Sequence, residues 1–508
     1  FGGVAQGGIV KNLSLKGFNL QANLNGGLLA GTVNGTVSNI TTDATSRIAG
    51  VKSTVLFTTC KGEHMGGIAG LVNPAGRIEN CTNRATVEGL KYAGGIAGYS
   101  ATTGNPVITG CVNYGTVTGT APQEYTQTGT PKPIEVYAGG IAGQLSGTAT
   151  NCVNGLVTMS SNNNAVGGIA GSTYSATTID GCVNYGEVTA RNYSAGGIVG
   201  ETANTTSLKA NMIQNCRNYG VISGINRIAG IAGYVKAYNT LKNCANFADL
   251  EPKGMRNGGI AGEVSATGSG SDPYAMFENC YNTGAISCNG YVAGIVGQTT
   301  KGVTACYNTG SITGAGNYVA GIVAFASGAS ASVKNCYNRA YVESTGSNVG
   351  AVVGMTNNAS AAMSNLYYLD FTCSQGIGSA KSTAQTATAK TRAEMTKSSF
   401  VRAMNTGLTT AAFVSSRYSP ALSWQTNLEG LITPSVGNID MDPFGYVNES
   451  DVELLRQYLA GKATLDADQL AQANVDNIGG VDQNDLDVLM QYVAGTINVF
   501  PVDRVEED

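Results

Sequence analysis

Short apolar stretches of three to five residues recur along the first 370 or so residues, each bounded by Gly, Asn or Ser. The first reads Gly-Gly-Ile-Ala-Gly, as at 94–98, the second ends in a cysteine, as at Cys111, and the third is a β-branched triplet, as at 116–118. Short runs rich in Val, Ile and Thr between turn-forming residues are typical of strands. The pattern therefore predicts three short strands in each repeat.

The Gly-Gly-Ile-Ala-Gly motif, called the head motif below, sets the period of the chain. Its second residue falls at 67, 95, 140, 168, 197, 230, 259, 294, 321 and, in a degenerate copy, 351. Most steps are 27–30 residues long. This period fits one coil of a parallel β-helix, in which each coil pairs with its neighbours. With two weaker copies near the N-terminus, we predict a mainly β fold, a β-solenoid of about twelve coils. The paired glycines are expected to turn a corner at φ values closed to other residues.

A column of cysteines accompanies the head motif, and an asparagine follows each cysteine two positions later. The cysteines are Cys81, Cys111, Cys152, Cys182, Cys216, Cys244, Cys280, Cys306 and Cys336. Because stacked side chains point the same way, we expect a ladder of reduced, buried thiols. Disulfides stay open as an alternative, since neighbouring Cα atoms would lie about 4.8 Å apart. The absence of a Cys-x-x-Cys pair argues against zinc. The asparagines are expected to stack their amides at a corner.

Composition divides the chain near residue 436. Only 12% of all residues are charged, Gly numbers 70 and Pro 11. Residues 437–508 contain 15 acidic and 3 basic residues, a net charge of −12, whereas the preceding part has a net charge of +8. The basic residues are scattered, which does not indicate nucleic-acid binding. No apolar run is long enough to span a membrane.

A second, unrelated repeat lies in the acidic part, where residues 440–461 match 474–495. Each copy has a carboxylate-rich loop followed by a helical pattern of about ten residues that ends in Gly. Oxygen-bearing residues occupy positions 1, 3, 9 and 12 of each loop, with a backbone carbonyl at 7 and Gly at 6, which is the calcium-loop spacing. The predicted Ca²⁺ ligands are Asp440, Asp442, Tyr446, Asn448 and Asp451 in the first loop and Asn474, Asp476, Gly480, Asp482 and Asp485 in the second. Position 5 holds Phe444 or Ile478, which should weaken both sites. Loops without metal remain the alternative.

The segment 374–436 lies between the two repeats. Residues 374–390 are of low complexity and are predicted to form a loop. Thr391 and Glu394 have capping-box spacing, and the apolar residues that follow predict one short helix ending at Gly407. We expect this segment to cap the solenoid and link it to the second repeat. The predicted domains are 1–373 for the solenoid, 374–436 for the cap and linker, 437–498 for the loop–helix pair and 499–508 for an acidic tail.

Both repeats resemble known families. The head motif followed by Asn-Cys-x-Asn-x-Gly-x-Val, over about residues 1–370, resembles the GLUG repeat of secreted and surface-attached bacterial proteins. The duplicated loop and helix resemble a type I dockerin, which implies calcium-dependent binding to a cohesin domain. The resemblance places the cohesin contacts at Glu449, Ser450, Arg456, Gln457, Gln483, Asn484, Met490 and Gln491.

Other chemistry is sparse, and no catalytic residue is predicted. The array has few acids, and none recurs at matched positions as a polysaccharide-cleaving β-helix would require. His64 lies near Cys60, but a structural role at a corner is favoured over a nucleophile pair. Tyr281, Tyr307 and Tyr337 follow the column cysteine, while Tyr114, Tyr185, Tyr219 and Phe247 come three residues after it. These rings could form an exposed sugar-binding strip, although an aromatic ladder that stabilises the coils is favoured.

The sequence is best explained as a non-catalytic extracellular scaffold or adhesin, secreted or attached to a cell surface. Its dockerin-like part would bind a cohesin-type partner, or neighbouring copies of the chain in a filament. The alternative is a cellulosome-type protein that binds or degrades polysaccharide. Because the chain begins with the repeat already under way, we also expect further sequence before Phe1, where an active domain could lie.

Overall fold

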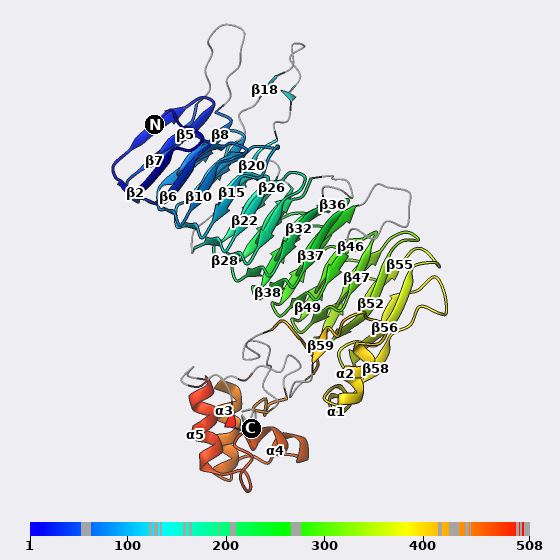
Figure 1. Ribbon diagram of the computed structural model, residues 1–508. Helices are drawn as coiled ribbons and strands as arrows, with labels where there is room; N and C mark the ends of the chain where they lie inside the picture. Colours follow the sequence, from blue (N-terminus) through cyan, green and yellow to red (C-terminus); the bar gives the residue numbers. More distant parts are fainter. Residues whose placement is uncertain are drawn as a thin grey trace. The chain divides into compact units, whose positions relative to one another are not determined.

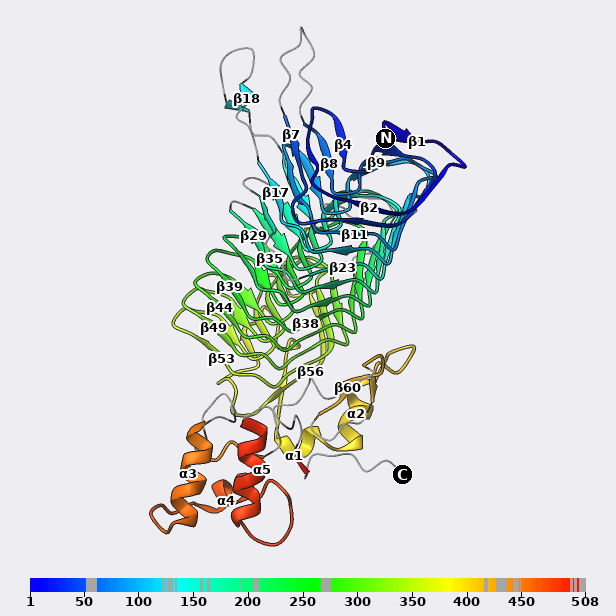
Figure 2. The same cartoon turned by 90° about the vertical axis from the view of Figure 1, so that its left-hand side faces the viewer.

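The computed structural model describes residues 1–51, 62–120, 124–125, 131–132, 135–155, 159–161, 165–191, 193–203, 210–265, 276–414, 419–425, 436–441, 447, 449–493, 497 and 500–501. The chain forms two compact units, 1–389 and 390–508. The first is a parallel β-solenoid of about 11 turns (Figures 1 and 2), as predicted.

Four parallel sheets run along the solenoid. Sheet A has 13 strands: β1 (Gly3–Val4), β5 (Ala30–Val33), β9 (Ala69–Val72), β14 (Ala97–Ser100), β21 (Ala142–Leu145), β26 (Ala170–Thr173), β31 (Val199–Glu201), β36 (Ala232–Lys236), β41 (Ala261–Ser265), β46 (Val296–Thr299), β51 (Val323–Ala326), β55 (Val353–Thr356) and β57 (Ile377–Ser379). Sheet D has 11 strands: β4 (Asn25–Gly27), β8 (His64–Gly66), β13 (Tyr92–Gly94), β20 (Tyr137–Gly139), β25 (Ala165–Gly167), β30 (Ser194–Gly196), β35 (Ile228–Ala229), β40 (Asn257–Gly258), β45 (Val292–Ala293), β50 (Val319–Ala320) and β54 (Val349–Gly350).

Sheets B and C complete the coils. Sheet C has 11 strands: β3 (Asn19–Ala22), β7 (Arg47–Gly50), β12 (Thr86–Gly89), β17 (Val117–Gly119), β24 (Met159–Ser161), β29 (Val188–Ala190), β34 (Ile222–Gly224), β39 (Leu250–Pro252), β44 (Ile286–Cys288), β49 (Ile312–Gly314) and β53 (Val342–Ser344). Sheet B is built mostly from two short strands per coil: β2 (Ile9–Leu15), β6 (Thr36–Thr42), β10 (Arg77–Glu79), β11 (Thr82–Asn83), β15 (Val107–Thr109), β16 (Val112–Asn113), β22 (Thr148–Thr150), β23 (Val153–Asn154), β27 (Thr178–Asp180), β28 (Val183–Asn184), β32 (Asn211–Gln214), β33 (Arg217–Asn218), β37 (Asn239–Lys242), β38 (Ala245–Asn246), β42 (Met276–Glu278), β43 (Tyr281–Asn282), β47 (Gly302–Thr304), β48 (Tyr307–Asn308), β52 (Ser332–Asn338), β56 (Ala362–Leu369) and β58 (Thr388–Lys390). Two small antiparallel pairs, β18 (Glu124–Tyr125) with β19 (Pro131–Lys132) and β59 (Phe413–Val414) with β60 (Ala421–Leu422), lie outside these sheets.

One coil therefore visits four sheets, in the order D, A, B, C, and not the three strands predicted. The coil from β13 to β17 shows the order, and β20 then begins the next coil on sheet D. Neighbouring coils pair in register, so that Ala97 pairs with Ala142 and Asn113 with Asn154. Because identical positions stack, each repeated residue becomes a column along the solenoid.

Among the described residues, two large and separate apolar cores fill the interior of the solenoid. Sheets A and B enclose Ile, Val and the column cysteines, including the isoleucine of the head motif, and sheets C and D enclose a second, smaller core. Between the two cores, the head motif packs against the asparagine column. Gly95 lies so close to Asn113 that an added Cβ would be 2.3 Å from the side-chain oxygen of Asn113. Each coil thus has a waist, where the corner from sheet D to sheet A turns inward.

The prediction that the paired glycines need unusual φ values is wrong. Gly94, Gly95 and Gly98 have no positive φ. These glycines are required because there is no room for a side chain. An added Cβ on Gly94 would lie 1.9 Å from the carbonyl oxygen of Ala97, one on Gly95 would lie 2.1 Å from a backbone oxygen, and one on Gly98 would lie 2.4 Å from a backbone nitrogen. The left-handed conformation lies elsewhere, at the residue before each column cysteine, such as Asn80 (φ 53°). Asn and Gly tolerate that conformation best, which explains why they occupy eight of these nine positions, the exception being Ala305 (φ 52°).

The asparagine column forms the predicted amide ladder. Each side chain is fully buried, and each from Asn83 to Asn308 donates to the next one, with 2.8 Å from Asn184 Nδ2 to Asn218 Oδ1. The same amide bonds its own turn, because Asn184 Nδ2 donates to the carbonyl of Gly186 at 2.9 Å and Asn184 Oδ1 accepts from the amide of Gly186 at 3.2 Å. The column thereby satisfies buried polar groups at the corner from sheet B to sheet C, as buried groups require.

The cysteine column is a ladder of free, buried thiols, as predicted. Each sulfur lies against a backbone carbonyl two residues earlier, at 3.0 Å from Cys216 Sγ to Gln214 O. Burial raises the pKa of the Cys216 and Cys280 thiols well above the ordinary value. Cys60 lies outside the described residues.

We expect the nine column thiols to resist alkylation in the native protein. Alkylation needs the reagent to reach the sulfur as a thiolate, and burial shields all nine sulfurs from the reagent. Iodoacetamide labelling followed by peptide mass spectrometry should therefore modify them only in denaturant, whereas the partly exposed Cys373 provides an internal control that reacts first. Rapid native labelling of several column cysteines would contradict the buried ladder.

The prediction that the low-complexity segment 374–390 forms a loop is wrong in part, because the segment contains β57 and β58. Gln385, which is buried, holds it in place: its side-chain nitrogen donates to the carbonyl of Ala361 at 3.0 Å, and its oxygen accepts from Thr356 Oγ1 at 2.7 Å. Polar residues can thus extend the solenoid where their side chains replace a turn's backbone bonds.

The second unit is helical. The capping box of Thr391 and Glu394 is present, but the predicted single helix is split into α1 (Arg392–Met395) and α2 (Ser398–Met404). Farther along are α3 (Glu449–Leu459), α4 (Ala467–Ala473) and α5 (Gln483–Val493). The duplicated pattern predicts α3 and α5, which pack together on one apolar cluster. It misses α4, although Asp466 and Gln469 form a second capping box.

Candidate functional site

The second predicted calcium loop folds back on itself around Asp485. This carboxylate is buried at the start of α5, and it accepts the backbone N–H groups of Asp482 at 2.9 Å and Asp476 at 3.2 Å. Burial raises the pKa of Asp485 above its ordinary value. Positive φ values at Asn477 (57°) and Gly479 (71°) allow the tight bend. Positions 3, 9 and 12 of the loop are therefore held together by the chain itself.

The first position of this loop provides an unsatisfied oxygen. Asn474 Nδ2 donates to the carbonyl of Gly479 at 3.3 Å, which leaves Asn474 Oδ1 buried with no hydrogen-bond partner. All the predicted ligand groups are oxygens, a donor set that suits calcium. Ile478, at position 5, is 72% exposed and points to solvent. Among the described residues, however, no three His, Cys, Asp or Glu side chains gather closely enough to hold a metal ion.

The first loop is described only at its ends. Asp451 is buried like Asp485, and its Oδ1 accepts the amides of Ile439 at 2.6 Å and Asp440 at 3.0 Å. The remaining predicted positions, which are Asp442, Phe444, Tyr446 and Asn448, lie outside the described residues. The two loops nevertheless share a buried carboxylate that holds loop amides at the start of the helix.

The predicted partner-binding residues lie on the exposed surfaces of α3 and α5. Ser450, Arg456, Gln457, Gln483, Asn484, Met490 and Gln491 are exposed, and the side chain of Glu449 lies outside the described set. Arg456 Nη2 lies 3.9 Å from Met490 Sδ, so equivalent positions of the two copies meet. The partner-binding role of these surface positions therefore stays a prediction, as does calcium binding by Asp442 and Asn448. The structure shows that α3 and α5, the helices that carry the surface positions, are formed.

The aromatic rows divide into a buried part and an exposed part. Tyr281, Tyr307 and Tyr337 stack 5.1 and 5.0 Å apart but are only 4, 1 and 1% exposed, so an exposed strip at these rings is ruled out. Tyr185, at 43% exposure, stacks on Tyr219 at 5.1 Å. Phe247 lies 4.5 Å from the other face of Tyr219. Since neighbours cover both faces of Tyr219, this row presents ring edges to solvent and acts chiefly as a ladder.

His64 has a structural environment, as favoured above. Its ring stacks on Tyr99 at 4.6 Å, and Nδ1 lies 2.5 Å from Asn25 Oδ1. Burial, with the nearby charge of Lys91, lowers the pKa of His64 to about 4. The imidazole is therefore neutral at physiological pH and part of an aromatic cluster.

The inward corner between sheets D and A brings together residues that the sequence pattern did not single out. Side chains from the outer faces of the two sheets meet there: Arg227 lies 4.1 Å over the ring of Tyr234, and Tyr318 stacks on Phe325 at 5.3 Å. The column on sheet D runs through Tyr92, Tyr137, Ala165, Ser194, Arg227, Arg256, Tyr291 and Tyr318. The column on sheet A is the residue that follows the head motif, and it runs through Tyr99, Gln144, Ser172, Glu201, Tyr234, Glu263, Gln298 and Phe325.

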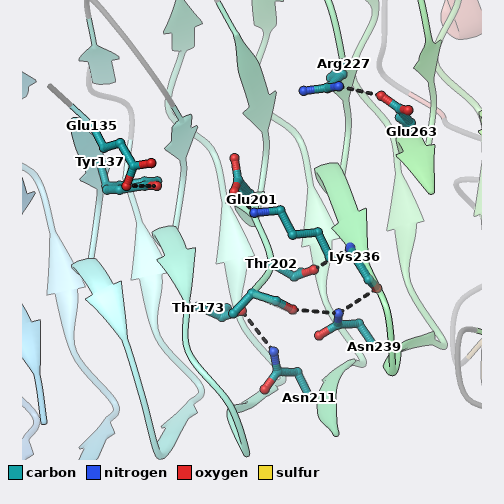
Figure 3. Close-up of polar contacts among 11 residues, drawn as sticks. Glu135, Tyr137, Thr173, Glu201, Thr202, Asn211, Arg227, Lys236, Asn239 and Glu263 are labelled. Carbon is teal, nitrogen blue, oxygen red and sulfur yellow. Dashed lines mark hydrogen bonds and ion pairs between the residues drawn. The ribbon is translucent and has the colours of Figure 1, made fainter. Parts of the chain in front are cut away.

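Charged residues concentrate in the middle of this corner (Figure 3). Glu263, whose side chain is 7% exposed, accepts from Arg227 Nε at 2.5 Å and from Arg256 Nη1 at 2.9 Å. Glu201 pairs with Lys236 on the adjacent coil. At the next corner, between sheets A and B, Asn211 donates to Thr173 and Asn239 donates to the carbonyl of Lys236, also drawn in Figure 3. Comparing the residues that directly follow the copies of the head motif would have revealed Glu201 and Glu263, the acidic residues of the corner between sheets D and A.

No helix among the described residues is both long and apolar enough to cross a membrane. Comparisons with models of protein families, with curated proteins and with solved structures find no match to this chain.

Proposed function

We propose that this chain is a non-catalytic extracellular scaffold, in which a GLUG-like β-solenoid is joined to a dockerin-like unit that docks a partner when calcium binds. The solenoid supports the scaffold role, because its columns are used for packing and hydrogen bonding. The dockerin-like unit supports the docking role, because two matched loop–helix copies place α3 and α5 side by side with exposed polar surfaces.

The observation that carries the proposal is the geometry of the second loop. Asp485 is buried and organises the loop amides, while Asn474 Oδ1 is buried without a partner. A buried oxygen and a buried carboxylate with a raised pKa both gain from a divalent cation. Asn474, Asp476, Asp482 and Asp485, with the carbonyl of Gly480, would hold calcium in this loop. Bound calcium would supply the positive charge that the acidic unit lacks and would order the surface presented by both helices.

Calcium is expected to raise the melting temperature of the helical unit and to bind the full chain at two sites. Asp485→Ala should reduce the calorimetric stoichiometry from two sites to one, because position 12 anchors the loop. Ile478→Asp should tighten the second site by about tenfold, since ligand charge sets the affinity of such loops. Asp468→Asn, in α4, removes the same charge without touching a loop and should leave both affinities unchanged.

The outcomes separate this proposal from its rivals. No heat and no change in melting temperature on adding calcium would mean that the loops bind no metal and would overturn the docking mechanism. Release of reducing sugar from a polysaccharide, abolished by a single carboxylate substitution in the solenoid, would establish the polysaccharide-degrading alternative. With calcium bound, the docking role is then tested by capture of a purified cohesin domain, for which Arg456→Ala and Met490→Ala should each weaken binding.

A further inference from the structure

Unpaired buried polar atoms gather at the inward corner between sheets D and A. Ser172 Oγ, Ser194 Oγ and Arg256 Nε are all buried and have no hydrogen-bond partner within the described part of the chain. Ser172 is 6% exposed and Ser194 is fully buried. Leaving such atoms unpaired is costly, and native proteins rarely do so without a reason. Three of them on two facing columns indicate that the corner completes its hydrogen bonds with something other than this chain.

Around Glu263 the corner carries an excess of positive charge, whereas at the Tyr137 end Glu135 adds a negative charge and accepts from the Tyr137 hydroxyl. Two guanidinium groups, from Arg227 and Arg256, share the single carboxylate of Glu263. The neighbouring pair of Glu201 and Lys236 is balanced and leaves this excess in place. A guanidinium with a free N–H is suited to a carboxylate, which it can bind through two parallel hydrogen bonds. The missing partner is therefore expected to be anionic.

Three small side chains, those of Ala165, Ser194 and Ser172, interrupt the two columns at this point. Ala165 and Ser194 on sheet D face Ser172 and Glu201 on sheet A, whereas Tyr137 lies on one side of them and Arg227, stacked on Tyr234, on the other. From the coil of Tyr137 to that of Arg227 there are three steps, or about 14 Å at the usual spacing of paired strands. Arg256 lies one coil beyond Arg227, so the stretch from Tyr137 to Arg256 spans four steps, or about 19 Å, which corresponds to the length of a short oligosaccharide.

We propose that this corner is a binding site for an acidic saccharide, with Ser172 and Ser194 bonding to sugar hydroxyls and Arg256 bonding to a carboxylate of the sugar. Serine hydroxyls both donate and accept, as sugar hydroxyls do. Glu201 adds an acceptor and Lys236 a donor at the rim, where their side chains are 17 and 24% exposed. The site lies on the solenoid and does not depend on the calcium loops, so each proposal can fail without the other.

The test is calorimetry of the full chain with oligogalacturonate as the acidic probe and cellohexaose as the neutral one. EDTA is present throughout, which excludes the loops and any calcium bridge. We expect oligogalacturonate to bind and cellohexaose to bind at least tenfold more weakly. Equal binding of the two sugars, or no binding of oligogalacturonate, would overturn the proposal.

Alanine variants link binding to the unpaired atoms. Ser172→Ala and Ser194→Ala should each weaken oligogalacturonate binding by about tenfold, the equivalent of one lost hydrogen bond to a charged or polar group. Neither should lower the melting temperature of the free protein, because no internal bond is lost. Ser223→Ala, on sheet C, removes a hydroxyl that does have a partner, Thr189, and should leave binding unchanged. If the Ser172 and Ser194 variants melt earlier and bind normally, the hydroxyls are satisfied within the protein and the site is disproved.

Discussion

Replacing Gly168 with alanine should lower the free energy of unfolding of the solenoid by about 3 kcal/mol or more, the upper range for an overpacked interior. A Cβ at this position would lie 2.1 Å from the carbonyl oxygen of Gly197 and 2.4 Å from Asn184 Oδ1. The first contact is with backbone of the next coil, which cannot rotate away. The second is with the amide ladder, whose buried bonds would have to lengthen. One methyl group therefore disturbs the waist from both sides.

The matched control is Gly302→Ala on β47. Its nearest neighbour would be Ser332 Oγ at 3.2 Å, which is the end of a rotatable side chain, and Gly302 has no positive φ. The substitution should be neutral or raise stability by about 0.5 kcal/mol by restricting the unfolded chain. Thermal unfolding followed by circular dichroism would measure both variants. A Gly168→Ala protein that melts with the wild type would show that the coils can separate at the waist without cost.

The difference between Gly168 and Gly302 lies in what surrounds each glycine, which the sequence of the solenoid predicts only in part. Periodicity identified the fold, the in-register columns and the buried thiols, because each of these follows from a residue type repeated at one spacing. The reason for the glycines could not be read from the pattern. Gly95 is required by the approach of Asn113 from the opposite side of the coil, and a contact between residues 18 positions apart has no local signature. For a related reason, the pattern does not predict sheet D as a separate sheet. One copy of the head motif contributes residues to a strand of sheet D and to a strand of sheet A.

The candidate sites show the same limit. The calcium loop could be predicted from spacing, because its ligands are close in sequence, and the raised pKa of Asp485 comes from burial that no spacing reveals. The corner between sheets D and A could not be found that way. Arg227 and Glu263 are 36 residues apart and meet because two sheets fold toward each other. Similarly, Tyr307 directly follows the buried Cys306, so strand alternation places it on the outer face of its coil, yet it is 1% exposed. Alternation gives the direction of a side chain from its strand but not what packs against it.

Replacing Asn184 with alanine should cost at least about 3 kcal/mol, because several buried groups lose their partners together and each contributes about 1–3 kcal/mol when left unsatisfied. Asn184 donates to Gly186 O and Asn218 Oδ1, and it accepts from Asn154 Nδ2 at 2.8 Å. Alanine also leaves a cavity beside the glycine waist. The control is Asn317→Ala, whose hydrogen bonds to Ser347 are exposed, so water can replace them and the change should be about 1 kcal/mol or less.

Asn184→Asp separates the hydrogen bonds from the volume of the side chain. The aspartate keeps the acceptor that faces Asn154 but replaces the donor that faces Gly186 O and Asn218 Oδ1 with a second oxygen. At neutral pH it would bury a charge against two oxygens, and the loss should be at least as large as for alanine. Burial raises the pKa of such a carboxyl in the folded state, so the folded protein binds the proton more tightly and the variant should regain stability as pH falls. Melting temperatures of the variant and the wild type, measured from pH 7 down to about pH 4, would show whether the variant regains stability as the pH falls. A variant as stable as the wild type at neutral pH would rule out a continuous donor–acceptor ladder through Asn184.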